Sequence, residues 1–218
     1  MTARATALVA LLGGSFDPVH NGHVALAALF DSLLHPTELR VLPAGNPWQK
    51  TNGLKASAEQ RVDMIRIAFA EAGLPVTIDR QEIERTSATY TIETLGKVRA
   101  ELGPEVPLVF LMGADQLQHL DTWRDWRELF ALTHFGVAAR PGYSLTALPD
   151  AVQAEITPRL ATADQLRDSA AGRVLLAPEL AVDISATQIR AALARDGDAK
   201  APVPGGVLDY IQQHNLYK

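Results

Sequence analysis

The stretch GGSFDPVHNGH, residues Gly13–His23, directly follows the apolar run Ala7–Leu12. A run without polar alternation is typical of a strand that is buried on both faces of a parallel sheet. Glycines allow a sharp turn and a close approach of the backbone to a ligand, and we expect Gly22 and His23 to open a helix. The positive end of such a helix, together with His20 and His23, predicts an anion site after the first strand.

Strand and helix patterns alternate along the rest of the chain. Further apolar runs are bounded by Gly or Pro and predict strands at Leu39–Leu42, Val76–Ile78, Leu108–Met112, Phe135–Ala138 and Val174–Leu176. Amphipathic segments predict helices at Gly22–Leu33, Ala58–Ala72, Tyr90–Leu102, Trp126–Leu132, Ser185–Ala194 and Val207–His214, with a helical insertion at Thr146–Gly172. This alternation predicts an α/β fold with a doubly wound, mostly parallel sheet that carries helices on both faces. We expect one domain over residues 1–218.

Composition excludes several classes of protein. Of the 218 residues, 47% are hydrophobic and 21% are charged, which is enough apolar mass for a sizeable core. The net charge of −5 argues against a nucleic-acid partner. The chain has no cysteine, so disulfides, a thiol nucleophile and cysteine metal sites are excluded. No apolar run reaches the roughly 18 residues of a membrane span, and we expect a cytoplasmic protein. The sequence makes no prediction of oligomeric state.

The first motif has a competing interpretation as a metal site. His20 and His23 are three residues apart and could supply two ligands, but apart from Asp17 no third ligand stands out nearby. A Walker A loop is disfavoured because Gly-Lys-Ser/Thr is missing at the helix start.

A second motif, Ile184–Arg190, reads ISATQIR near the C-terminus. Ser185 and Thr187 stand at a predicted helix start, where hydroxyls and unpaired backbone N–H groups can meet an anion. Arg190 follows about one turn later and can reach back with its donor fork. The alternative is ordinary capping by Ser185 and a solvated Arg190.

Together, the two motifs resemble the signatures of the HxGH nucleotidyltransferase superfamily. That resemblance implies a Rossmann-like nucleotidyltransferase fold and the transfer of a nucleotidyl group from a nucleoside triphosphate to a phosphate acceptor, with release of pyrophosphate. Further blocks each follow a different predicted strand or open a helix: Pro43–Lys50, Arg85–Leu95, Leu111–Leu117, Leu120–Trp123 and Ala139–Tyr143. This series is similar to the bacterial nicotinate-nucleotide adenylyltransferases, from Gly13 to Leu216-Tyr217.

The resemblance implies a reaction and a set of site residues. Nicotinate mononucleotide would attack ATP in line, without a covalent enzyme intermediate, giving deamido-NAD (nicotinate adenine dinucleotide) and pyrophosphate in NAD biosynthesis. Mg²⁺ would accompany ATP, with no metal site of the protein's own, and the C-terminal helices within 185–218 would close the nucleotide site. The implied catalytic residues are His20, His23, Lys50 and Arg190. The implied ATP-binding residues are Gly13, Gly14, Ser15, Phe16, His20, His23, Gly113, Asp115, Arg140, Ile184, Ser185, Thr187 and Arg190. The implied residues for nicotinate mononucleotide are Ser15, Phe16, Lys50, Thr89, Tyr90 and Trp123.

Individual side chains keep plainer alternatives. Trp123 would stack on the pyridine ring, whereas Trp126 is expected in the core. Asp115 would lie near a ribose hydroxyl and could also cap a helix, and Lys50 could be a solvated surface charge. The remaining histidines, His35, His119, His134 and His214, are expected to be structural.

Three alternatives to this function stay open. The chain could be a pantetheine-phosphate adenylyltransferase, or an enzyme that prefers the amidated nicotinamide mononucleotide. It could also be a nucleotide-binding protein that keeps the fold without turnover.

Overall fold

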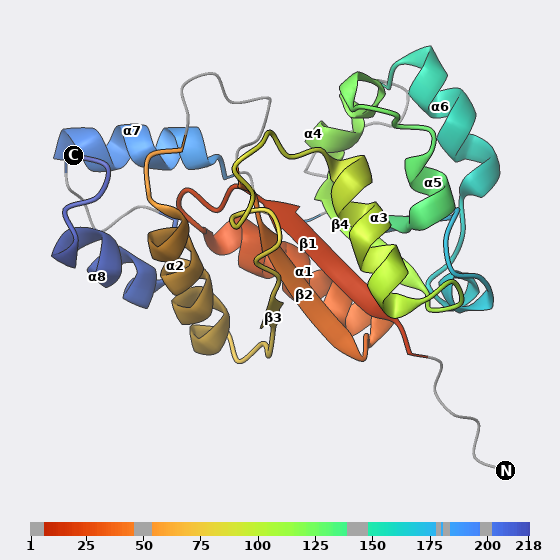
Figure 1. Ribbon diagram of the computed structural model, residues 1–218. Helices are drawn as coiled ribbons and strands as arrows, with labels where there is room; N and C mark the ends of the chain where they lie inside the picture. The colour runs from red at the N-terminus through yellow and green to blue at the C-terminus, as the bar shows by residue number, and fades with distance from the viewer. Residues whose placement is uncertain (1–6, 46–53, 139–147, 178–179, 181–183, 197–201) are drawn as a thin grey trace, which may run out of the picture.

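Six parallel strands form the single sheet of the computed structural model, which describes residues 7–45, 54–138, 148–177, 180, 184–196 and 202–218 (Figure 1). The strand order is β3-β2-β1-β4-β5-β6, and each neighbouring pair is parallel. The strands are β1 (Val9–Gly14), β2 (Glu38–Pro43), β3 (Thr77–Ile78), β4 (Leu108–Gly113), β5 (His134–Ala138) and β6 (Val174–Ala177). All six predicted strands are confirmed, because runs buried on both faces are continuous in sequence.

Helices connect successive strands as crossovers, and two more helices follow β6. The longer helices are α1 (Asn21–Leu34), α2 (Ala58–Glu71), α3 (Thr91–Leu102), α6 (Asp150–Ile156), α7 (Ala186–Asp196) and α8 (Gly205–Gln213). The shorter ones are α4 (Ala114–Leu117), α5 (Leu129–Leu132) and the 3₁₀ turns η1 (Leu120–Thr122), η3 (Thr157–Arg159) and η4 (Asp164–Asp168). The helix predicted over Trp126–Leu132 is reduced to α5, and the predicted insertion is a series of short helices. None of the helices in these described ranges is long and apolar enough to cross a membrane.

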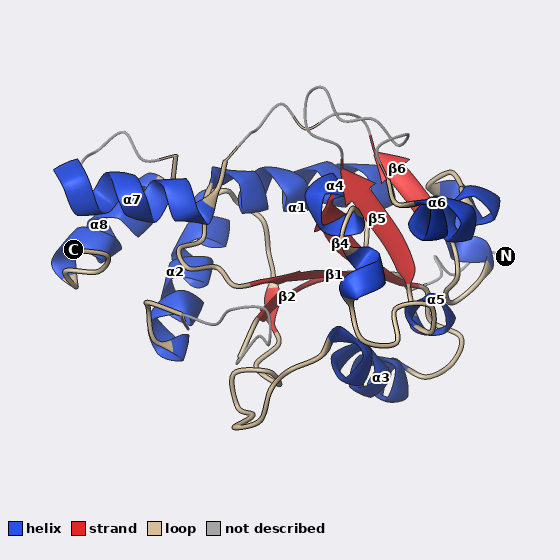
Figure 2. Ribbon diagram, turned by 90° about the horizontal axis from the view of Figure 1, so that it is seen from above, coloured by secondary structure: helices blue, strands red, loops and turns tan. Residues whose placement is uncertain are grey.

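The sheet divides the core into two layers, and β1 contributes side chains to both. Ala10 and Leu12 pack with α1, α2, α7 and α8, whereas Val9 and Leu11 pack with α3 to α6. Successive side chains of a strand point to opposite faces, so a single apolar run serves two cores. Figure 2 shows α1 and α3 on opposite sides of the sheet, as expected for a doubly wound fold.

The turn after β1 differs from the sequence expectation. Gly13 and Gly14 are still strand residues, paired in register with Leu42 and Pro43 of β2. The left-handed position is Phe16, with φ of 49°. The glycines are needed for space instead, because a Cβ at Gly13 would lie 3.0 Å from the Phe110 ring and one at Gly14 would lie 3.1 Å from the Phe16 ring.

Candidate active site

Two pockets adjoin where β1 and β4 end, which is where the strand order reverses. Ligands of open α/β sheets bind at this switch point. We call the pocket lined by Trp123, Thr89 and Glu82 the tryptophan pocket, and the one lined by His20, His23 and Arg190 the histidine pocket. Their volumes are about 440 and 450 Å³ respectively, within the roughly 300–1,000 Å³ of small-molecule sites. Residues at or just after the ends of the two central strands line both pockets: Gly13, Gly14, Ser15, Asp115 and Gln116.

The histidine pocket gathers three distant segments of the chain. Every described residue that the resemblance implies for ATP lines it: Gly13, Gly14, Ser15, Phe16, His20, His23, Gly113, Asp115, Ile184, Ser185, Thr187 and Arg190. These residues lie at or just after the end of β1, at or just after the end of β4, or around the start of α7. The fold therefore brings both sequence motifs to one cavity.

His20 and His23 cap the helix that starts in this pocket. The two rings stack with centroids 3.7 Å apart, and the Phe16 ring lies 4.7 Å from that of His23. The His20 backbone N–H donates to His23 Nδ1 at 3.2 Å. Because Nδ1 accepts, the neutral His23 ring carries its proton on Nε2 as a hydrogen-bond donor. The pocket thus combines a polarised helix N-terminus with an oriented imidazole, which is suited to phosphate oxygens.

Arg190 reaches from α7 to the loop after β1. Its Nη1 donates to the Asp17 carbonyl oxygen at 2.6 Å, and its Nη2 donates to Thr187 Oγ1 at 3.2 Å. Ser185 immediately precedes α7. Arg190 is half-buried, and both ends of its fork have partners within the protein, so the alternative of a purely solvated side chain loses support.

Buried side chains hold the backbone of the loop after β1. Arg61, which is 2% exposed, donates from Nη1 to the Ser15 carbonyl oxygen at 2.8 Å. Burial lowers the pKa of the Arg61 guanidinium, an effect opposed most by the nearby Asp17. Phe16, in its left-handed conformation, lies between the two held carbonyl groups of Ser15 and Asp17. Such a conformation costs about 1–3 kcal/mol and persists only where the surrounding structure fixes it.

The tryptophan pocket is lined by the start of α3 and the segment before it, by the segment after β4, and by residues of β1, β2 and β4. Trp123 is half-buried and stands edge-on to Phe110, with ring centroids 6.2 Å apart. Glu82 is buried and accepts a hydrogen bond from Thr94 Oγ1 at 2.7 Å. Trp126 is buried in the core, as expected. The pocket therefore offers an aromatic face beside polar groups.

Some implied residues lie elsewhere. Tyr90 precedes α3, and the Arg124 guanidinium lies 4.7 Å from its ring centroid. Tyr90 is not among the described residues that line either pocket. Lys50 and Arg140 fall outside the described residues.

Asp115 lies in the first turn of α4 rather than at its cap. Gly113 is the capping residue, and a Cβ there would lie 2.5 Å from Asp115 Oδ1. Glycine therefore leaves room for this carboxylate beside both pockets.

Sequence reasoning missed several lining residues. Gln116 lines both pockets, and Glu82 and His119 line the tryptophan pocket, although His119 was expected to be structural. Gln116 and His119 follow Asp115 in the same segment after β4, and that position was the available signal. Glu82 had no comparable signal.

The structure gives little support to the metal interpretation of the first motif. In the part of the chain that is described, no three His, Cys, Asp or Glu side chains gather as a metal-binding group. Asp17, the nearest candidate in sequence, is 1% exposed, and its carboxylate accepts from the backbone N–H groups of Lys55 and Ala56 at 2.8 and 3.0 Å. Its oxygens serve the protein's own loops.

Comparisons with known proteins find a matching family model and similar sequences. The cytidylyltransferase-like family model matches residues 11–192. A protein of Herminiimonas arsenicoxydans named "probable nicotinate-nucleotide adenylyltransferase" is 58% identical over 98% of both chains. A protein of Laribacter hongkongensis with the same name is 46% identical over 100% of this chain and 98% of its own.

A solved structure has the same fold. Plasmodium falciparum nicotinic acid mononucleotide adenylyltransferase, complexed with NaAD, superposes with a TM-score of 0.74 over 97% of both chains at 19% identity. Taken with the sequence relatives, the chain belongs to the cytidylyltransferase-like family and, within it, to the nicotinate-nucleotide adenylyltransferases.

Proposed function

We propose that this protein joins nicotinate mononucleotide to the AMP part of ATP, giving nicotinate adenine dinucleotide and pyrophosphate. The observation that carries this proposal is the pair of adjoining pockets with a common wall at the ends of β1 and β4. One pocket suits a phosphate chain and the other suits a flat ring. A reaction that joins two nucleotides needs two such sites in contact.

ATP would occupy the histidine pocket. The N-terminus of α1, His20, His23 and Arg190 would meet its phosphates, and Asp115 would lie near a ribose hydroxyl. Nicotinate mononucleotide would occupy the tryptophan pocket, with its pyridine ring on Trp123. Aromatic stacking contributes roughly 1–3 kcal/mol per ring in nucleic-acid systems, which is enough to matter for a small ligand.

The common wall would hold the reacting atoms. A phosphate oxygen of nicotinate mononucleotide forms a bond to the α-phosphorus of ATP, and the bond from that phosphorus to the bridging oxygen of pyrophosphate breaks. In the product, the two nucleotide phosphates are joined to each other through one bridging oxygen. The electron pair of the broken bond leaves with the released pyrophosphate. No protein nucleophile is needed, because alignment and charge stabilisation supply the catalysis.

Mg²⁺ would enter as part of the Mg²⁺–ATP substrate. Mg²⁺ prefers phosphate oxygens and water to an all-protein cage, and the described lining of the histidine pocket is rich in donors rather than carboxylates. The protein's donors would hold the phosphates, and the ion would reduce their mutual repulsion. Lys50 and Arg140 are further proposed contacts to the phosphates and the nucleotide.

We also propose that the chain is one domain over 1–218 whose segment 185–218 closes the nucleotide site. Arg190 supports this proposal, because it joins α7 to the loop after β1. We further propose that the protein works in the cytoplasm, where ATP is made and used, and fractionation of cells would check this location.

The test is pyrophosphate release by the purified protein with Mg²⁺–ATP. Nicotinate mononucleotide, nicotinamide mononucleotide and phosphopantetheine are supplied in parallel. A strong preference for the first is the expected result. A preference for either of the others would keep adenylyl transfer but overturn the acceptor. Tight ATP binding without release for any acceptor would favour a binding protein.

A further inference from the structure

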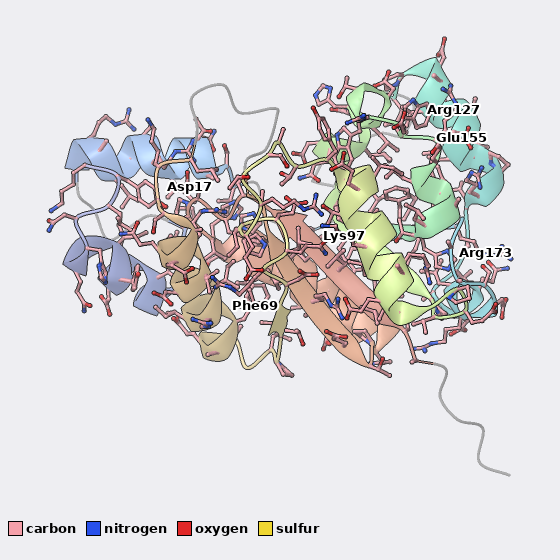
Figure 3. The ribbon with its side chains drawn as sticks, in the orientation of Figure 1. Asp17, Phe69, Lys97, Arg127, Glu155 and Arg173 are labelled. Atoms are coloured by element: carbon pink, nitrogen blue, oxygen red, sulfur yellow. The ribbon has the colours of Figure 1, made fainter. Side chains whose placement is uncertain are left out.

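Tyr217, the last residue but one, packs half-buried against the loop that carries His20. Its hydroxyl donates to Asp17 Oδ1 at 2.8 Å, across 200 residues of sequence. Asp17 is 1% exposed and already accepts from Lys55 and Ala56. Figure 3 shows Asp17 between α7 and the N-terminal end of α2, so this carboxylate joins several distant segments.

The contacts of Asp17 lead directly to the histidine pocket. Its carbonyl oxygen accepts from Arg190, and the residue before it, Phe16, packs its ring on His23. Phe16 is also the strained position of the loop, with φ of 49°. A strained backbone keeps one conformation only where its neighbours are fixed. The carboxylate of Asp17 is therefore placed to transmit the position of Tyr217 to His23 and Arg190.

The surroundings of Tyr217 favour a permanent hydrogen bond. Burial and the adjacent Asp17 raise the pKa of the Tyr217 hydroxyl, so it stays protonated and donates. The bond joins a half-buried neutral donor to a buried carboxylate, and a hydrogen bond to a charged acceptor is a strong type.

We propose that Tyr217 is a positioning residue for adenylyl transfer: through Asp17 it fixes the loop after β1, and with it His23 and Arg190, in the geometry that the reaction requires. This inference rests on the proposed function, because it takes that reaction as one of its readouts. Tyr217 does not line either pocket among the described residues, so its effect is on alignment rather than on direct contact with a substrate.

The test compares two tyrosines of the same C-terminal segment. Tyr217→Phe removes the hydroxyl and keeps the ring. Tyr210→Phe is the matched control, because the Tyr210 hydroxyl donates to Asp63 Oδ2 at 3.1 Å and thereby joins α8 to α2 without touching Asp17. We expect Tyr217→Phe to lower kcat about tenfold, since misplacement by about 1 Å costs up to 10²-fold. Its KM for ATP should change less than threefold, roughly, because the donors themselves remain. Tyr210→Phe should keep the wild-type kcat.

A double-mutant cycle tests the route through Asp17. Asp17→Asn alone should lower kcat, and adding Tyr217→Phe to it should lower kcat little further. Equal kcat in the wild type and folded Tyr217→Phe would overturn the proposal. So would equal losses in Tyr217→Phe and Tyr210→Phe, or fully additive effects with Asp17→Asn.

Hydrogen exchange provides a readout that does not depend on turnover. Backbone amides in the segment 13–24 should exchange faster in Tyr217→Phe than in the wild type or Tyr210→Phe. If the wild type itself releases no pyrophosphate, the proposed function fails, and unchanged exchange in Tyr217→Phe would separately overturn the positioning role.

Discussion

Replacing Arg190 tests whether its fork contributes to the reaction. The guanidinium uses two nitrogens on two partners, Asp17 and Thr187, at 2.6 and 3.2 Å. The single ammonium of Arg190→Lys keeps the charge but cannot reproduce both contacts. A hydrogen bond from a charged donor is worth about 1.5–3 kcal/mol, which corresponds to a loss of roughly 10- to 10²-fold in rate if the contact aligns the transition state. Arg190→Ala also loses the charge, and we expect a loss of roughly 10²-fold or more, the scale of one preorganised donor.

The stability of the fold should survive both substitutions. Arg190 is only half-buried, and the loss of its hydrogen bonds should lower the free energy of unfolding by about 1–3 kcal/mol. In a chain of this length 1 kcal/mol shifts Tm by about 2–4 °C. Assays at 25 °C on variants with a single cooperative melt therefore report on the site and not on unfolding.

The assay is steady-state pyrophosphate release with nicotinate mononucleotide and saturating Mg²⁺–ATP, alongside equilibrium binding of an ATP analogue that cannot react. The expected order of kcat is wild type, then Arg190→Lys, then Arg190→Ala. Wild-type turnover in a folded Arg190→Ala would refute the assignment of Arg190 to the site. Equal losses in the two variants would show that the fork, rather than the charge, carries the effect.

Three further substitutions test other parts of the structure. Trp123→Ala should raise KM for nicotinate mononucleotide about tenfold or more, from the lost stacking of roughly 1–3 kcal/mol; a selective loss of ATP affinity would refute its placement. His134 accepts from the Arg173 backbone N–H at Nδ1, and its Nε2 lies 2.8 Å from the Ser169 carbonyl oxygen. Burial lowers its pKa from 6.5, so its contribution to stability is complete above about pH 6.5 and is lost as the pH falls through the folded pKa. The urea midpoint of unfolding, measured from about pH 7.5 down to about pH 5, should therefore fall more steeply for the wild type than for His134→Gln. Equal dependence of the two midpoints on pH would contradict this reasoning. Arg99 donates to the carbonyl oxygens of Leu132, Gly103, Val106 and Ala170, and Arg99→Met should lower the free energy of unfolding by about 3 kcal/mol, measured as a Tm about 6–12 °C lower with little change in KM.

The sequence predicts the sheet well because its strands are buried on both faces. Leu108–Met112 and Phe135–Ala138 are uninterrupted apolar runs, and they became β4 and β5. The helices were less regular where local signals compete. Over Trp126–Leu132 only α5 is helical, and Asp125, directly before Trp126, has φ of 50°. A left-handed residue keeps a helix from extending through its position, and the apolar pattern of Trp126–Leu132 does not show it.

The glycine pair shows how a correct motif can have a different physical basis. Gly13 and Gly14 were expected to make the turn, but both are extended and paired with β2. The turn is made by Phe16, a bulky residue for which a positive φ is not a default. Local propensity would place the positive φ at a glycine and not at Phe16. Contacts of Arg61 with Ser15 and of Asp17 with Ala56 hold the residues on either side of Phe16, and both contacts join distant segments.

Long-range contacts mark the limit of what the sequence could predict about the site. The named residues of the histidine pocket could be listed from the sequence because each lies in a motif at a strand end or a helix start, and the topology brings those positions together. Arg61 lies within a helix whose pattern explains it as an ordinary helical position, and Tyr217 lies at the end of the chain. The resemblance extends to Tyr217 without giving it a role. Only the folded structure brings its hydroxyl to Asp17, because a bond across 200 residues has no local signature in either segment. Residues that contact a ligand are therefore the easier ones to read from a sequence of this kind, and residues that hold those contacts in place are the ones for which coordinates are needed.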